Sequence, residues 1–122
     1  MKKIAIAMLV VFSMALVAFA AAGPEKINLA EKWGLDTKKP AVIFPHAMHQ
    51  AKNECTDCHV SADGGALKNL KKGGEMDPKA LVAAGKIKKG KTKNAVHDNF
   101  CWDCHKKKKV KKGKSCNTCH KK

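Results

Sequence analysis

The chain has 122 residues, and its 25 basic residues outnumber its ten acidic ones, which gives a formal net charge of +15 at pH 7. A length of this size allows one small domain. All of the basic residues are lysine. Because the chain lacks arginine and carries no recognition motif of a nucleic-acid-binding protein, the charge favours acidic protein partners over nucleic acid.

Residues 1–22 read as an exported leader. A basic start at Lys2 and Lys3 precedes an apolar run and then a group of small residues. This order is typical of a secretory signal peptide, and we expect cleavage between Ala20 and Ala22. The alternative is an uncleaved membrane anchor, since the apolar run approaches spanning length. We expect a periplasmic protein without stable membrane insertion.

The mature domain, residues 23–122, would carry a net charge of +13, because Lys2 and Lys3 leave with the signal peptide. Its N-terminal part, as far as about residue 39, is polar and predicted to be rich in loops. The runs 27–30 and 41–44 can form a small antiparallel ribbon that Pro45 ends. A short helix is predicted to follow, from about His46 towards Lys52.

Residues 60–96 hold no cysteine or histidine, and glycine pairs interrupt them. Within this stretch, Asp77 is a predicted helix N-cap, Pro78 a first helical position and Gly85 a C-terminal stop. The lysine-rich residues 86–93 should form a solvated loop. The predicted fold class is mostly irregular, with short α-helices and a small N-terminal two-stranded β ribbon.

The six cysteines occur only as three Cys-x-x-Cys-His units, which are Cys55-Thr56-Asp57-Cys58-His59, Cys101-Trp102-Asp103-Cys104-His105 and Cys116-Asn117-Thr118-Cys119-His120. This motif is the attachment signature of c-type haem. Two cysteines three positions apart can bond one haem edge, and the next histidine can reach the iron. A lone Cys-x-x-Cys can also be a zinc knuckle or a redox disulfide, but three copies, each followed at once by histidine in an exported chain, favour haem. A disulfide framework is a further alternative, and it would not explain the histidine after every motif.

Three histidines remain outside the motifs: His46, His49 and His97. Three irons with one motif histidine each would need three more ligands, so the counts favour two histidines at every iron. The only mature methionines are Met48 and Met76, and a methionine ligand would raise the potential. Three surface histidines are the alternative reading. Full coordination of the irons would argue against substrate binding at the metal.

The order Phe44-Pro45-His46-x-x-His49, one motif, a lone histidine four residues before a second motif, and then a third motif resembles the class III cytochromes c. More narrowly, it resembles the triheme cytochrome c7 group, which lacks one haem of the tetrahaem cytochromes c3. The resemblance covers about residues 41–122. It implies a fold with haems forming the core, and three haem c cofactors.

The resemblance also implies the ligand pairs. They are His46 with His59 on the haem of Cys55 and Cys58, His49 with His105 on the haem of Cys101 and Cys104, and His97 with His120 on the haem of Cys116 and Cys119. The insertion at about 60–96 is a departure from the compact members. It could be a remnant of the fourth site, a cover over a haem, or a partner contact.

Members of this family are periplasmic, low-potential electron carriers of anaerobic bacteria. We therefore expect a monomeric carrier for anaerobic respiration, and not an enzyme. Its partners would be redox proteins such as a hydrogenase, a formate dehydrogenase or a membrane cytochrome complex, with acidic surfaces that dock on the Lys106–Lys122 region. The alternative function is a terminal reductase of metal ions or oxyanions at an exposed haem edge.

Overall fold

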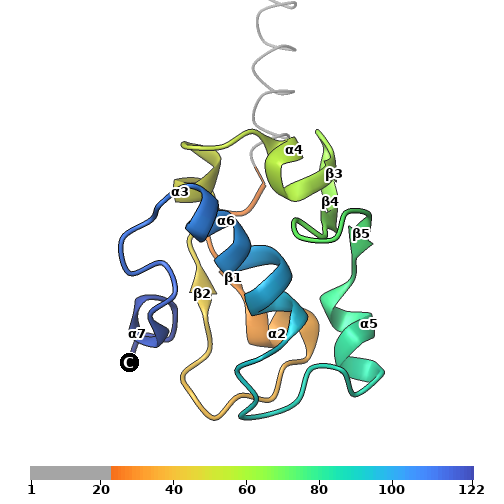
Figure 1. Cartoon of the computed structure of the whole chain (residues 1–122), viewed down its shortest axis with the longest axis vertical. Coiled ribbons are helices and arrows are strands. Elements are labelled where there is room, and N and C mark those ends of the chain that lie inside the picture. Colours follow the sequence, from red (N-terminus) through yellow and green to blue (C-terminus); the bar gives the residue numbers. More distant parts are fainter. Residues whose placement is uncertain (1–22) are drawn as a thin grey trace, which may run out of the picture.

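The computed structural model describes residues 23–122, so the expected signal peptide and its cleavage site lie outside the described residues. Short elements connected by loops make up this part of the chain (Figure 1). In chain order they are β1 (Ile27–Asn28), α2 (Leu29–Trp33), β2 (Ile43–Phe44), α3 (His46–Gln50), α4 (Cys55–Cys58), β3 (His59–Ser61), β4 (Gly64–Lys68), β5 (Glu75–Met76), α5 (Pro78–Ala83), the π-helix η1 (His97–Cys101), α6 (Trp102–Lys107) and α7 (Cys116–Cys119). Between residues 23 and 122, no helix has the length and apolar character needed to cross a membrane.

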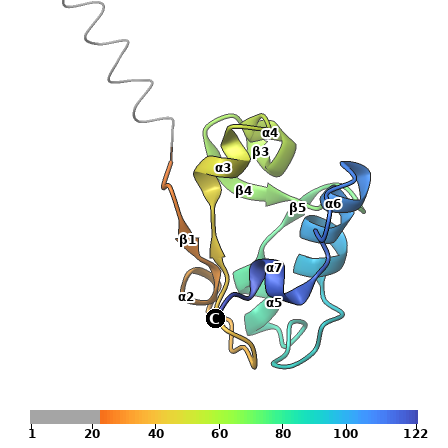
Figure 2. The ribbon, with the colours of Figure 1, turned by 90° about the vertical axis from the view of Figure 1, so that its left-hand side faces the viewer.

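Strands β1 and β2 form a two-stranded antiparallel ribbon, with Ile27 opposite Phe44. They lie side by side in both views of the molecule (Figures 1 and 2). The ribbon comes from the two runs in which the sequence predicted it. Pro45 then ends the strand and starts α3, where the Pro45 carbonyl accepts a hydrogen bond from the His49 backbone N–H at 3.2 Å. The ribbon therefore fixes the direction in which α3 presents its histidines.

Helix α2 corrects the prediction of a loop-rich N-terminal segment. Asn28 caps it, because its side-chain oxygen accepts from the backbone N–H groups of Ala30 and Glu31 at 3.1 and 3.3 Å. Gly34 ends it with a φ of +66°, a left-handed conformation that favours glycine. One helical turn and a half is too short for a clear hydrophobic period, so burial of Leu29 and Trp33 decides its structure.

The insertion forms a three-stranded antiparallel sheet in the order β3-β4-β5, followed by α5. The sequence predicted sheet only at the N-terminus, so these strands are a correction. They are short, and the glycines of β4 hid the alternation that marks a strand. The predicted helix is confirmed: Asp77 caps α5 by accepting from the Ala80 N–H at 3.0 Å, and Gly85 follows it with a φ of +67°. These elements run down one side of the molecule (Figure 1).

The apolar core of the described residues is small. Leu29, Trp33 and Val96 form its buried cluster, and Met76 and Phe100 are the other buried hydrophobic side chains. Each keeps between 4% and 9% of its surface exposed. A core of this size is marginal for a domain of about 100 residues, which therefore needs a further source of stability.

Candidate functional site

The six histidines lie in three pairs. The ring centroids of His46 and His59 are 6.3 Å apart, with an angle of 75° between the ring planes. The corresponding values are 6.3 Å and 22° for His49 with His105, and 6.4 Å and 68° for His97 with His120. A ring nitrogen bonds a metal ion at about 2 Å and the ring centre lies roughly 1 Å further out, so two rings on one metal ion should be roughly 6 Å apart. Each pair therefore leaves space for one metal ion between its rings.

The second nitrogen of every one of these rings is bonded to the backbone. Each Nδ1 lies 2.6–3.1 Å from a carbonyl oxygen, which is that of Pro24 for His46, Pro45 for His49, Gly65 for His59, Thr92 for His97, Gly113 for His105 and Pro40 for His120. A carbonyl can only accept, so Nδ1 carries the hydrogen and donates it. At His97 the Asn94 amide nitrogen also lies 3.0 Å from Nδ1, and the shorter 2.6 Å contact with the Thr92 carbonyl makes Nδ1 the donor there too. These contacts assign the lone pair to Nε2, which is the arrangement that metal-bound histidines show.

Helix α3 supplies a histidine to two different pairs. His46 and His49 are three positions apart on it, as the sequence predicted, and they face His59 and His105 respectively. Phe44 packs against the His49 ring with centroids 4.3 Å apart. Burial lowers the pKa of His49, which favours the neutral imidazole that a metal ion requires. Two of the three pairs are thus joined through one short helix.

The cysteines of the first and third motifs lie on single helical turns. α4 begins at Cys55 and α7 at Cys116, and each ends at the second cysteine, so the motif histidine is the first residue after the helix. Asp57 closes the turn of α4 by accepting from the Glu54 N–H at 3.1 Å. One turn therefore places two thiols and one imidazole close together at each motif.

The second motif begins at the junction of η1 and α6, where Cys101 ends one helix and Trp102 starts the next. All six cysteines of the described chain are free thiols. Burial raises the pKa of Cys58 and of Cys119, and it raises the pKa of Cys101 to about 12. These thiols are therefore neutral at physiological pH.

The insertion at about 60–96 supplies backbone carbonyls that bind one histidine in each of two pairs. The Gly65 carbonyl fixes His59, and the Thr92 carbonyl fixes His97. It is also tied to the rest of the chain, because the Leu70 N–H donates to the Asn99 carbonyl at 2.9 Å and Lys107 donates to the Leu70 carbonyl at 3.2 Å. Sequence reasoning missed these carbonyl groups, because every residue carries one and no side chain marks those that bind a histidine.

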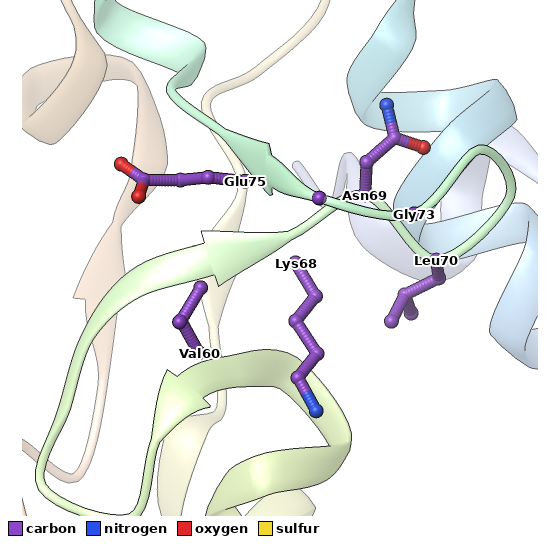
Figure 3. A pocket seen from close by; sticks show the side chains of 7 residues that line it. Val60, Lys68, Asn69, Leu70, Gly73 and Glu75 are labelled. Atoms are coloured by element: carbon purple, nitrogen blue, oxygen red, sulfur yellow. The ribbon is translucent and has the colours of Figure 1, made fainter.

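A shallow apolar hollow of about 380 Å³ lies on the insertion. Residues of the β3-β4-β5 region line it, among them Val60, Lys68, Leu70 and Glu75 (Figure 3). Lys68 and Leu70 point to one side of the ribbon, and Lys68 donates to the Thr56 carbonyl of the first motif at 2.5 Å. No cysteine or histidine lines this hollow, so it is separate from the histidine pairs.

Several lysines of the Lys106–Lys122 region have partners within the chain. Lys107 forms an ion pair with Asp103 at 2.6 Å, and Lys108 lies 3.9 Å from the Asp57 carboxylate. The ammonium group of Lys114 lies 5.2 Å from the centre of the Trp102 ring. Within the described residues, no group of three or more histidine, cysteine, aspartate or glutamate side chains is arranged to hold a metal ion by itself.

The class III cytochrome c family model matches residues 21–122, which is most of the chain. No curated protein and no solved structure matches the chain. The paired imidazoles and the cysteine turns fit the cofactor of that family, because each pair offers two Nε2 atoms and each motif offers two thiols. The chain therefore belongs to the class III cytochromes c, which are multihaem electron-transfer proteins with covalently bound haem c.

Proposed function

We propose that this protein is a periplasmic, low-potential electron carrier with three haem c groups, each held by two histidines. The haem on Cys55 and Cys58 takes His46 and His59; the haem on Cys101 and Cys104 takes His49 and His105; and the haem on Cys116 and Cys119 takes His97 and His120. When bound, each haem supplies a reversible one-electron couple, and two histidine ligands keep its potential lower than a methionine ligand would.

The observation that carries this proposal is the shared geometry of the three pairs. Centroids between 6.3 and 6.4 Å apart, together with a bonded Nδ1 on every ring, are what two axial ligands of one iron require. Surface histidines would not all have the same partner type at the same nitrogen. The family indicates that the cofactor is haem c, and the three histidine pairs support three haems in this chain.

The residues of the chain would do three things in such a carrier. The histidines bind and orient the cofactor, the cysteine turns hold it covalently, and the backbone carbonyls accept from Nδ1 and so direct Nε2 of each ring towards the iron. Large flat apolar cofactors would also supply the core that the side chains provide only in part. We propose carriage of electrons between redox proteins, and not enzymatic turnover, as the role of this arrangement.

The test is the intact mass of the exported protein from a host that matures c-type cytochromes, with its visible spectrum recorded on the same sample. We expect a mass increase of three haems and low-spin bands without a methionine–iron band. The Met48→Leu variant is the control, because Met48 is an exposed methionine between His46 and His49, and it should leave both readings unchanged. Fewer haems, or a high-spin band, would overturn the assignment.

A further inference from the structure

The ring of His97 is stacked on the indole of Trp102. Their centroids are 4.7 Å apart and their planes are 18° from parallel. This distance lies within the range of favourable aromatic pairs. The two residues belong to different sites: His97 pairs with His120, whereas Trp102 lies between Cys101 and Cys104 of the second motif. The stack is thus a direct contact between two sites.

A π-helical turn produces this stack. His97 and Trp102 are five positions apart, and the Trp102 N–H donates to the His97 carbonyl across η1. In an α-helix, residues turn by about 100° each, so residues five apart point in well separated directions. The wider turn of a π-helix brings them onto one side. The π-helix is rare, and single π-turns are frequently found at functional sites.

A hydrogen bond restrains the edge of the His97 ring, whereas Trp102 contacts its face. Nδ1 donates to the Thr92 carbonyl at 2.6 Å. Asn94 lies against this bond: its amide nitrogen is 3.0 Å from Nδ1 and donates to the same carbonyl at 3.3 Å, while its oxygen accepts from the His97 N–H at 3.1 Å. The Cβ–Cγ bond and this hydrogen bond both restrain the same edge of the ring, so the ring plane can still tilt about that edge, and contact with a flat partner limits this tilt. The Trp102 indole makes such a contact with the face of the His97 ring.

Trp102 is itself held in place. It is half-buried, it starts α6 between two cysteines, and the Lys114 ammonium lies 5.2 Å from its ring centre. A cation within about 6 Å of an indole centre is attracted to the face of the ring. The indole is therefore constrained by the backbone of the second motif and by a lysine that precedes the third.

We propose that Trp102 is a positioning residue that sets the plane of the His97 imidazole and so couples the third haem site to the attachment motif of the second. This inference rests on the proposed function, because it assigns His97 as a haem ligand. The orientation of an axial imidazole governs the electron paramagnetic resonance signal of a low-spin iron. Loss of the stack should therefore change the signal of one site out of three.

The experiment compares oxidised holoprotein with the Trp102→Phe and Trp102→Met variants by electron paramagnetic resonance. The third-site signal is identified as the one that a His97→Ala variant removes. We expect Trp102→Met to shift and broaden that signal alone, and Trp102→Phe, which keeps a smaller ring, to shift it less. The matched control is Trp33→Phe, since Trp33 is a buried tryptophan in the apolar cluster, and it should leave the three signals in place.

The proposal is overturned if Trp102→Met leaves all three signals unchanged, or if it moves all three alike. If Trp102→Met does not take up three haems, the Trp102→Phe variant decides by nuclear magnetic resonance. The paramagnetically shifted ring protons of His97 should then move while those of His46 and His49 stay; unmoved His97 protons would contradict the proposal. A wild-type protein with fewer than three haems would instead refute the proposed function.

Discussion

At the scale of single residues, the hydrogen bond that each Nδ1 donates to a backbone carbonyl determines which ring nitrogen can bind a metal ion. The bond assigns the proton to one nitrogen and leaves the other to a metal ion. The accepting groups are backbone carbonyls, which every residue carries. The place of a residue in the fold therefore decides whether its carbonyl binds a histidine. Gly113 is the clearest case: its carbonyl accepts from His105 at 2.7 Å, and a Cβ built on it would lie 2.8 Å from the His105 Cβ.

The Gly113→Ala variant should therefore disturb His105. A contact under 3 Å with a Cβ atom forces the backbone or the histidine to move, because neither group is the flexible end of a side chain. We expect an altered low-spin signal from the second site, and a lower midpoint in thermal unfolding. The signal is measured by electron paramagnetic resonance and the midpoint by circular dichroism.

The control for this variant is Gly34→Ala. Gly34 also resists substitution, but for a conformational reason: its φ is +66° and nothing lies within 4 Å of the added Cβ. The Gly34→Ala change should lower the free energy of unfolding by about 1 kcal/mol. It should not change any of the three electron paramagnetic resonance signals. An unchanged second-site signal in Gly113→Ala would show that His105 does not depend on this close contact.

At the scale of elements, the molecule is built from helices of one or two turns whose ends decide which groups meet. Such helices are not stable alone. Their side-chain caps and the cofactor must hold them. Asn94 and Asp77 are comparable caps, since each accepts from a backbone N–H three residues later, at 3.1 and 3.0 Å. Only Asn94 lies beside a histidine.

The Asn94→Ala and Asp77→Ala variants should separate stability from site geometry. Loss of either cap should cost about 0.5–2 kcal/mol, measured as a lower free energy of unfolding in denaturant. Only Asn94→Ala should also change the third-site signal, because Asn94 supports the carbonyl that binds His97. Equal spectra for the two variants would mean that the Asn94 side chain acts only as a cap.

At the scale of the whole molecule, the described chain has a small core and many exposed lysines. The buried side chains Leu29, Trp33 and Val96 form one cluster, and the other buried hydrophobic residues lie outside it. The histidine pairs lie between elements that are distant in the sequence, for example α3 and the second motif. A cofactor at each pair would therefore connect the elements that the side chains do not.

The haem-free chain should consequently be poorly folded. Expression without the maturation system should give a protein with weak helical circular dichroism and little protection of its amides from hydrogen exchange. The reason is that few buried apolar contacts remain to offset the loss of chain entropy. A haem-free chain with a cooperative thermal transition would contradict this expectation.

The net positive charge predicts faster encounter with acidic partners. We expect the rate of electron transfer to an acidic redox protein to fall as ionic strength rises, because salt screens the attraction. Stopped-flow kinetics at several salt concentrations measure this rate. The Lys121→Gln and Lys122→Gln variants test the C-terminal region, with Lys89→Gln as the control, since Lys89 pairs with Asp36 elsewhere on the surface. A rate independent of salt would contradict steering by the lysines.

The sequence by itself determined the family and the local structure around its motifs. The order of cysteines and histidines predicted class III cytochrome c, and the family match confirms it. The short helix at His46 and the capped helix after Asp77 were also predicted correctly. These features depend on residues within a few positions of one another, so local chemistry is enough to fix them.

Only the tertiary structure decided which backbone carbonyls bind the Nδ1 atoms, those of the insertion included, and the stack of Trp102 on His97. The sheet at 59–76 and helix α2 also escaped prediction. Each depends on contacts between segments far apart in the chain, or on a single wide helical turn, and neither leaves a periodic pattern in the residues. Side-chain chemistry marks the cysteines and histidines, but the path of the backbone determines how each histidine is held.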